Sequence, residues 1–235
     1  MKIQVFNSEE EASLRALEIF KESKQQGANV FGLATGSTPI RLYELLSQSN
    51  LDFSQDISIN LDEYYGLPSH HPQSYAYFME QHLFKNKQFK MSYLPDGMAK
   101  DVEAELARYD QLIRDNPIDL QLLGLGSNGH IGFNEPGSDL TAETSFVNLT
   151  PSTIADNQRF FEDGEAVPHQ AISMGIGTIL RSRKIVLMAF GSKKSQAIKE
   201  MIEGPITKDL PASALQAHKQ VYVLLDPAAA SLLNR

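Results

Sequence analysis

The chain has 235 residues, a formal net charge of −8 at pH 7 and 42% hydrophobic residues, a composition typical of one folded globular domain. It contains no cysteine, which excludes disulfides, thiolate metal sites and a cysteine nucleophile. The acidic balance argues against nucleic-acid or anionic membrane partners, and no stretch resembles a signal peptide or a membrane span. We therefore expect a cytoplasmic protein with a single catalytic domain over residues 1–235.

Five short runs rich in apolar residues are predicted to be strands. They are Asn29–Ala34, Ile57–Leu61, Ile118–Leu125, Lys184–Phe190 and Gln220–Leu225. Several are nearly continuous in apolar residues, which is typical of strands covered on both faces in a parallel sheet.

Helix signals lie before and between these strands. Ser8 to Glu11 reads as a capping box, and Gly27 is suited to end the helix that follows. Further helices are predicted to start at Thr38-Pro39, to run from His71-Pro72 through Phe84, and to cover Lys100–Asp115 and Ser192–Glu203. The alternation predicts a doubly wound α/β fold, whose ligands bind at the carboxyl ends of the strands.

Two of the predicted strand ends are suited to bind an anion. The segment TGSTP (35–39) contains a glycine and hydroxyl side chains and leads into a predicted helix, whose first backbone N–H groups can hold a phosphate. GSKKS (191–195) follows another strand and carries two lysines, which oppose the helix dipole unless an anion is bound. Alternatively, TGSTP is an ordinary turn with a good N-cap, and the lysines of GSKKS are simply exposed to solvent.

Two carboxylates, Asp62 and Glu63, directly follow the strand Ile57–Leu61. Successive strand residues face opposite ways, so at most one of them is expected to point into the cleft, where it could serve as a general base. A solvated acidic turn is the alternative.

The segment GLGSNGHIGFNEP (124–136) places His130 among glycines. A histidine can exchange protons near neutral pH, and Asn128 and Glu135 could orient its ring. A structural histidine is the alternative reading. The glycines match Gly-x-Gly-x-x-Gly spacing, but the residues that follow do not continue as a helix, which argues against a dinucleotide site.

Taken together, these segments resemble the glucosamine-6-phosphate deaminase family over essentially the whole chain. The resemblance rests on TGSTP, NLDEYYGLP, HPQSYAYFM, GLGSNGHIGFNEP, NQRFF, AISMGIGTIL and GSKKSQAI, in the family's order. It implies a single-domain, Rossmann-like fold with a mainly parallel sheet and helices on both faces. It also implies amino-sugar breakdown, in which glucosamine 6-phosphate and water give fructose 6-phosphate and ammonia, with no metal or other cofactor.

The resemblance also implies roles for particular residues. The carboxylate of Asp62 would remove the C2 proton of the opened sugar, and His130, with Asn128 and Glu135, would promote ring opening. The substrate phosphate would be bound by Gly36, Ser37, Thr38, Arg159 and Lys194. A mobile lid is expected around residues 144–170.

Two features differ from many members of the family. Asn128 stands where an aspartate is common, so a carboxylate restored there should raise the proton affinity of His130. The stretch Thr144–Asn148 lacks the basic residues of allosteric members, and the chain ends soon after its last predicted strand. We therefore expect a monomeric, non-allosteric enzyme.

Two other functions compete with deamination. A 6-phosphogluconolactonase would share the fold and a related Gly-His segment, although that family continues differently after the histidine. A non-catalytic sugar-phosphate sensor would bind such ligands without turnover. The presence of Asp62, His130 and Glu135 together favours the deaminase.

Overall fold

The computed structural model describes residues 1–158, 161 and 166–234. Seven parallel strands form the main sheet, in the order β1-β10-β9-β6-β2-β3-β5. They are β1 (Lys2–Val5), β2 (Val30–Leu33), β3 (Phe53–Asn60), β5 (Phe89–Tyr93), β6 (Leu120–Leu123), β9 (Lys184–Ala189) and β10 (Val221–Leu225). Their burial is nearly complete in β2, β6 and β9, as expected for strands covered on both faces.

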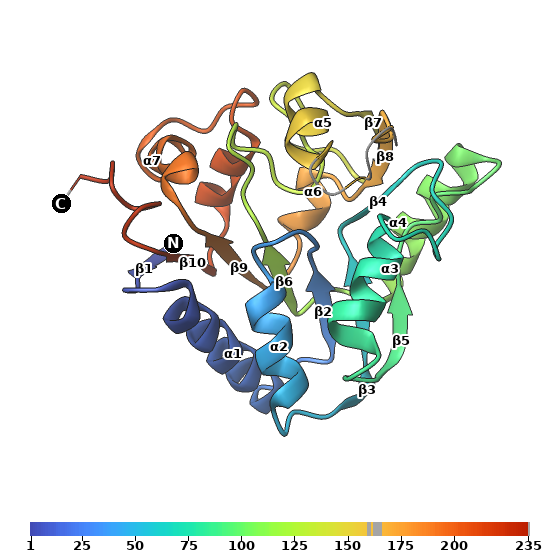
Figure 1. Cartoon of the computed structure of the whole chain (residues 1–235), viewed down its shortest axis with the longest axis horizontal. Helices are drawn as coiled ribbons and strands as arrows, with labels where there is room; N and C mark the ends of the chain where they lie inside the picture. The colour runs from blue at the N-terminus through green and yellow to red at the C-terminus, as the bar shows by residue number, and fades with distance from the viewer. Residues whose placement is uncertain (159–160, 162–165, 235) are drawn as a thin grey trace.

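Helices cover both faces of this sheet, as the fold-class prediction required (Figure 1). One side carries α1 (Glu9–Gln25), α2 (Ile40–Gln48), α3 (Tyr75–Met79) and the π-helical turn η1 (Glu80–Phe84). The other side carries α4 (Val102–Asp115), α6 (Ile176–Ile179) and α7 (Ser195–Glu203), with the short 3₁₀ segments η2 (Ser192–Lys194) and η3 (Pro211–Ala217) flanking α7 along the chain. The predicted doubly wound α/β architecture is therefore confirmed.

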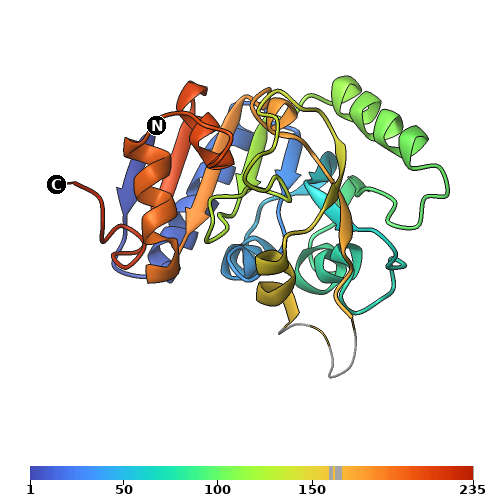
Figure 2. The same cartoon turned by 90° about the horizontal axis from the view of Figure 1, so that it is seen from above.

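A second, smaller sheet is antiparallel and was not predicted. It pairs β4 (Asp62–Tyr64) and β7 (Ser145–Asn148) with the central β8 (Gln170–Ser173), and α5 (Pro151–Gln158) follows β7. The β7–β8 ribbon and α5 project together to one side of the main sheet (Figure 2). Its buried aromatic cluster includes Tyr64, Phe133 and Phe161, and is separate from the main core.

The element boundaries correct several predictions. β1 and β5 were missed because they form the sheet edges and carry exposed side chains, and β3 begins at Phe53 rather than Ile57. The α1 cap is confirmed, since Ser8 Oγ accepts a hydrogen bond from the Glu11 N–H at 3.2 Å.

Three predicted helix starts are wrong. Pro39, not Thr38, occupies the N-cap position of α2. The helix expected from His71 begins at Tyr75, because Ser74 Oγ accepts a hydrogen bond from the Tyr77 N–H. Ser192 opens a 3₁₀ turn, and α7 itself begins three residues later.

Candidate active site

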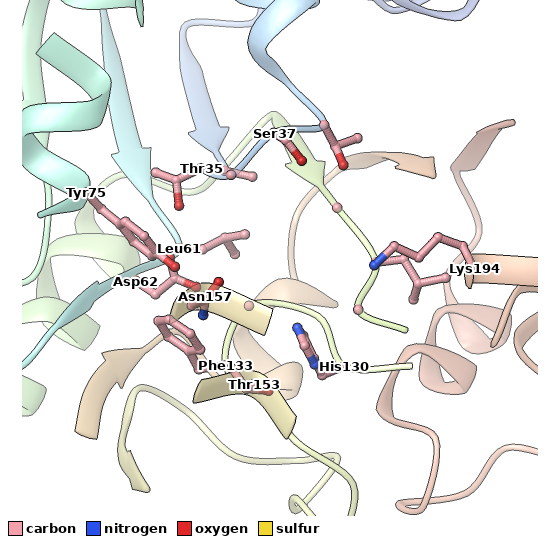
Figure 3. Close-up of a pocket in the computed structure, with 17 residues that line it drawn as sticks. Thr35, Ser37, Leu61, Asp62, Tyr75, His130, Phe133, Thr153, Asn157 and Lys194 are labelled. Atoms are coloured by element: carbon pink, nitrogen blue, oxygen red, sulfur yellow. The ribbon is translucent and has the colours of Figure 1, made fainter. Parts of the chain in front are cut away.

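A pocket opens at the carboxyl ends of β2, β3 and β6, where the chain order of the sheet reverses (Figure 3). This is the place where doubly wound folds bind ligands. Its lining consists of Ala34–Thr38, Leu61, Asp62, Tyr75, Gly124–Gly126, His130, Gly132, Phe133, Thr153, Asn157 and Lys194. Ser37 and Lys194 lie on one side in Figure 3, and Asp62 and Tyr75 lie on the other.

One side of the pocket is suited to an anion. Gly36 has φ +90°, a conformation that favours glycine, and the turn it makes leads into the N-terminus of α2. No side chain among the described residues caps that N-terminus, so backbone N–H groups of its first turn are directed to the pocket end of the helix. Gly36, Ser37 and Thr38 all line the pocket.

The predicted second anion segment contributes one lysine to the pocket. Gly191 has φ +84° and its N–H donates to the Asp226 carboxylate, which fixes the turn between β9 and η2. Lys194 lines the pocket, whereas the exposed Lys193 does not. The ammonium group of Lys194 projects toward the pocket from the side of Ser37 (Figure 3).

Asp62 lies where the chain passes from one sheet to the other. Leu61 donates its N–H to Leu33 in the main sheet, and Asp62 then pairs with Ser173 in the small sheet. The side chain of Asp62 is buried, and within the described part of the chain its carboxyl group accepts no hydrogen bond. Burial, and then the charge of Glu63, raise the pKa of Asp62 to about 8.

Glu63 points away from the pocket, as strand alternation predicted for one of the two carboxylates. Its carboxylate accepts hydrogen bonds from the backbone N–H groups of Tyr64, Tyr75 and Ala76, each at 2.8 Å. It therefore holds the N-terminus of α3, and with it the Tyr75 ring, beside Asp62. Glu63 is a structural residue of the site.

The ring of His130 is part of a hydrogen-bonded network. Asn128 Oδ1 lies 2.7 Å from His130 Nδ1 and also accepts the His130 backbone N–H at 3.2 Å. Asn128 Nδ2 donates to Glu135 Oε2 at 2.8 Å, and that oxygen lies 3.5 Å from His130 Nδ1. The backbone donor on one side and the carboxylate acceptor on the other fix the amide orientation. His130 consequently carries its proton on Nδ1, which leaves Nε2 as a base.

Burial raises the pKa of Glu135, but the nearby His130 and the hydrogen bonds from Thr153 and Asn128 outweigh that effect and lower the pKa to about 2. Thr150 Oγ1 adds a further donor to Glu135 Oε1 at 3.2 Å, and Thr153 Oγ1 donates to the same oxygen. Glu135 is therefore a stable anion close to the histidine.

Two glycines make this arrangement possible. A β-carbon at Gly126 would lie 2.3 Å from atoms of the His130 ring, so only glycine admits the ring there. Gly132 has φ +58°, and a β-carbon on it would lie 3.4 Å from Asp62 Oδ2. Gly126 therefore makes room for the His130 ring, whereas the atoms nearest a β-carbon at Gly132 belong to Ser173, Asn134 and Asp62.

Sequence reasoning missed several pocket residues. Tyr75 stacks on Phe133, with ring centroids 5.8 Å apart, and Thr153 and Asn157 enter the lining from α5. The helix start at LTPST (149–153) was the available signal for Thr153.

Arg159 lies outside the described residues, as does part of the predicted lid at 144–170. In the described part, no group of three or more histidine, aspartate and glutamate side chains could hold a metal ion. No helix among the described residues is long and apolar enough to span a membrane.

Comparison with known proteins identifies the family. Residues 8–223 match the model of the glucosamine-6-phosphate isomerases/6-phosphogluconolactonase family. A glucosamine-6-phosphate deaminase of Oenococcus oeni is 56% identical, with both chains fully covered. A solved monomeric glucosamine-6-phosphate deaminase is 42% identical, covers 99% of this chain and 100% of its own, and has a TM-score of 0.94.

A 6-phosphogluconolactonase of Leishmania guyanensis shares the fold, with 20% identity, coverage of 100% of this chain and 99% of its own, and a TM-score of 0.80. The match of the family model over most of the chain agrees with the full-length match to the Oenococcus protein. The chain belongs to the glucosamine-6-phosphate isomerase/6-phosphogluconolactonase family.

Proposed function

We propose that the protein is a glucosamine-6-phosphate deaminase, which converts glucosamine 6-phosphate and water to fructose 6-phosphate and ammonia. The observation that carries the proposal is the joint presence of Asp62 and His130 in one pocket whose opposite side is suited to a phosphate. Relatives of that name at 56% and 42% identity support it.

The substrate phosphate would bind at the uncapped start of α2 and at Lys194. Gly36, Ser37 and Thr38 supply backbone and hydroxyl donors, and Arg159 is proposed as a further cation. Binding at this end is remote from C1 and C2, so it can hold the reacting carbons in position beside Asp62. Substitution of Lys194 by alanine should therefore raise KM more than it lowers kcat.

His130 would open the sugar ring. Because Asn128 accepts the Nδ1 hydrogen bond, Nε2 can take the proton of the C1 hydroxyl group and later return a proton. The negative charge of Glu135 stabilises the imidazolium that forms during this transfer.

Asp62 would then remove the C2 proton of the open-chain sugar. The C2–H electron pair forms the C1=C2 double bond of an enolamine while the C1 carbonyl oxygen takes up a proton. A proton then adds at C1, and the resulting C2 imine adds water and releases ammonia. Asp62 retains a proton at neutral pH because its pKa is raised to about 8. The ammonium group of the substrate would favour the carboxylate form when it lies beside Asp62.

The decisive assay measures ammonia and fructose 6-phosphate from glucosamine 6-phosphate, beside hydrolysis of 6-phosphogluconolactone. The proposal requires the first reaction and its loss in Asp62→Asn. Lactone hydrolysis alone would identify a lactonase. Binding of the sugar phosphate without turnover, equal in wild type and Asp62→Asn, would identify a sensor.

The monomeric state, cytoplasmic location and lack of allostery are part of the same proposal. The solved relative described as monomeric supports the first, and the absence of basic residues in Thr144–Asn148 supports the third. Sedimentation should give a monomer of 26.1 kDa, and kinetics should be hyperbolic with or without N-acetylglucosamine 6-phosphate. A single catalytic domain with a mobile lid around residues 144–170 belongs to the same proposal.

A further inference from the structure

Two threonines at the start of α5 contact the His130 network from a different part of the chain. Thr153 is 3% exposed and its hydroxyl donates to Glu135 Oε1. Thr150 lies 3.2 Å from the same oxygen, again through its hydroxyl. The other carboxylate oxygen, Oε2, accepts from Asn128.

The hydroxyl groups of Thr150 and Thr153 have different structural roles. Thr150 Oγ1 accepts the Thr153 backbone N–H at 3.3 Å, which is the contact of an N-cap residue with the third residue of its helix. Thr153 is not needed for that cap. The burial of its hydroxyl against Glu135 therefore has no explanation in helix capping, and it points to a role at the carboxylate.

The donors of the network follow from its contacts, and the Thr150 hydroxyl also donates to Thr153 Oγ1 at 3.3 Å. The Thr153 hydroxyl donates to Glu135, the Asn128 amide donates to the same carboxylate, and His130 Nδ1–H donates to the Asn128 carbonyl oxygen. If the Thr153 donor is lost, the Glu135 oxygens carry more uncompensated negative charge. That charge draws a proton to the His130 ring and lets the amide and the ring change orientation.

We propose that Thr153 is a positioning residue for the ring-opening step. Its hydroxyl holds Glu135 in place, and Glu135 in turn fixes the Asn128 amide. Asn128 then keeps the proton of His130 on Nδ1, so that Nε2 is available to the sugar. Thr150 assists from the cap of α5. This inference rests on the proposed function for its role in the reaction, but the state of the His130 ring can be measured without turnover.

Other charged and titratable groups also face the pocket. They are Asp62 on β4, Tyr75 on α3 and Lys194 on η2. A pH–rate profile would combine the titration of these groups with that of His130. The test therefore uses nuclear magnetic resonance of the His130 ring, assigned by comparison with His130→Gln.

The experiment compares Thr153→Val, which removes the hydroxyl at nearly constant shape, with Thr153→Ser, which retains it. Thr141→Val is the matched control, because it removes a hydroxyl that donates to Asp139 at 2.7 Å at an exposed position. If Thr153→Val does not fold, Thr153→Ala replaces it. Ring ¹⁵N spectra report which nitrogen carries the proton, and a pH series gives the titration midpoint.

For Thr153→Val we expect the midpoint to rise by roughly half a pH unit, a fraction of the shift that a directly contacting charge causes. The Nδ1–H form should lose population, and kcat should fall about threefold to tenfold with KM within about twofold. Thr153→Ser and Thr141→Val should match wild type. An unchanged midpoint and tautomer in Thr153→Val would overturn the proposal, as would a change in KM alone. A midpoint shift in a protein that releases no ammonia would support the positioning contact but refute the deaminase function.

Discussion

Asp62 and Glu135 are both buried carboxyl groups at the same site, and the fold surrounds them in opposite ways. Asp62 accepts no hydrogen bond from the described residues and sits next to the charge of Glu63, so its pKa is raised to about 8. Glu135 is contacted by Asn128 and two threonine hydroxyls and lies near His130, so its pKa is lowered to about 2. Burial alone therefore does not decide the charge of a carboxyl group, and neither does the number of donors. Glu63 accepts three backbone N–H bonds and burial still raises its pKa to about 7, whereas Glu135 is kept ionised by its donors together with the nearby histidine.

This difference matches two chemical tasks. A group that must take a proton from carbon needs a high proton affinity, which a solvated or hydrogen-bonded carboxylate lacks. A group that must stabilise an imidazolium needs to stay charged at every working pH. The comparison can be tested by changing each carboxyl group in turn.

The largest effect is expected for Asp62→Asn. The amide cannot accept the C2 proton, so kcat should fall by about 10²–10⁴-fold, the usual contribution of a general base. Steady-state ammonia release measures this loss. Retention of more than about a tenth of the wild-type kcat would show that another group takes the proton.

The same variant should be more stable than wild type above about pH 4. A carboxyl group with a raised pKa stabilises the folded state only below its unfolded pKa, and that contribution is lost as the pH rises toward 8. The advantage of Asp62→Asn should thus grow between pH 4 and pH 8, to a few kcal/mol in order of magnitude. Urea unfolding at several pH values measures it, and a constant difference would contradict the raised pKa.

Glu135→Gln should have a smaller effect on turnover and the opposite effect on stability. Loss of the charge beside His130 should lower kcat roughly 10-fold to 100-fold, since the proton-transferring groups remain. Loss of a charge-assisted acceptor should cost about 1.5–3 kcal/mol of unfolding free energy at pH 7. The difference in unfolding free energy between wild type and Glu135→Gln should vanish as the pH falls from 4.5 through 2, where wild-type Glu135 becomes protonated. Equal stabilities at pH 7 would contradict this account.

Asn128→Asp is expected to have the smallest effect. It replaces the amide group that donates to Glu135 Oε2 at 2.8 Å with a second carboxylate beside the histidine. The added charge should raise the proton affinity of His130, and the acidic limb of the pH–rate profile should move upward by less than about one unit. An unchanged profile would show that Asn128 acts only as a spacer.

Much of the site could be predicted because it follows the strand ends. The parallel strands bring residues 35–38, 62, 124–132 and 194 to one edge, although they are far apart in sequence. Strand alternation anticipated that only one of Asp62 and Glu63 would face the pocket. Alternation could not predict what Glu63 binds, because two of its three partners are backbone N–H groups of α3, twelve and thirteen residues away.

The rest depends on tertiary packing that no local pattern records. The small sheet of β4, β7 and β8 consists of strands of three and four residues, too short to show a period. Thr153 contacts Glu135 only because α5 packs next to the segment that carries His130 and Glu135. Threonine is common near helix starts, so its position in the sequence does not indicate this contact. The position of the pocket at the strand ends was predictable, but the two threonine donors to Glu135 were not.

The central claim is that Asp62 takes the proton from C2, and loss of that proton can be followed directly. Glucosamine 6-phosphate is incubated with the enzyme in D₂O while proton resonance monitors the C2–H signal of the substrate and the C1 position of fructose 6-phosphate. The account predicts that wild type places deuterium at C1 and that Asp62→Asn neither exchanges the C2 proton nor forms product at a comparable rate. Exchange at C2 in Asp62→Asn at the wild-type rate would contradict it.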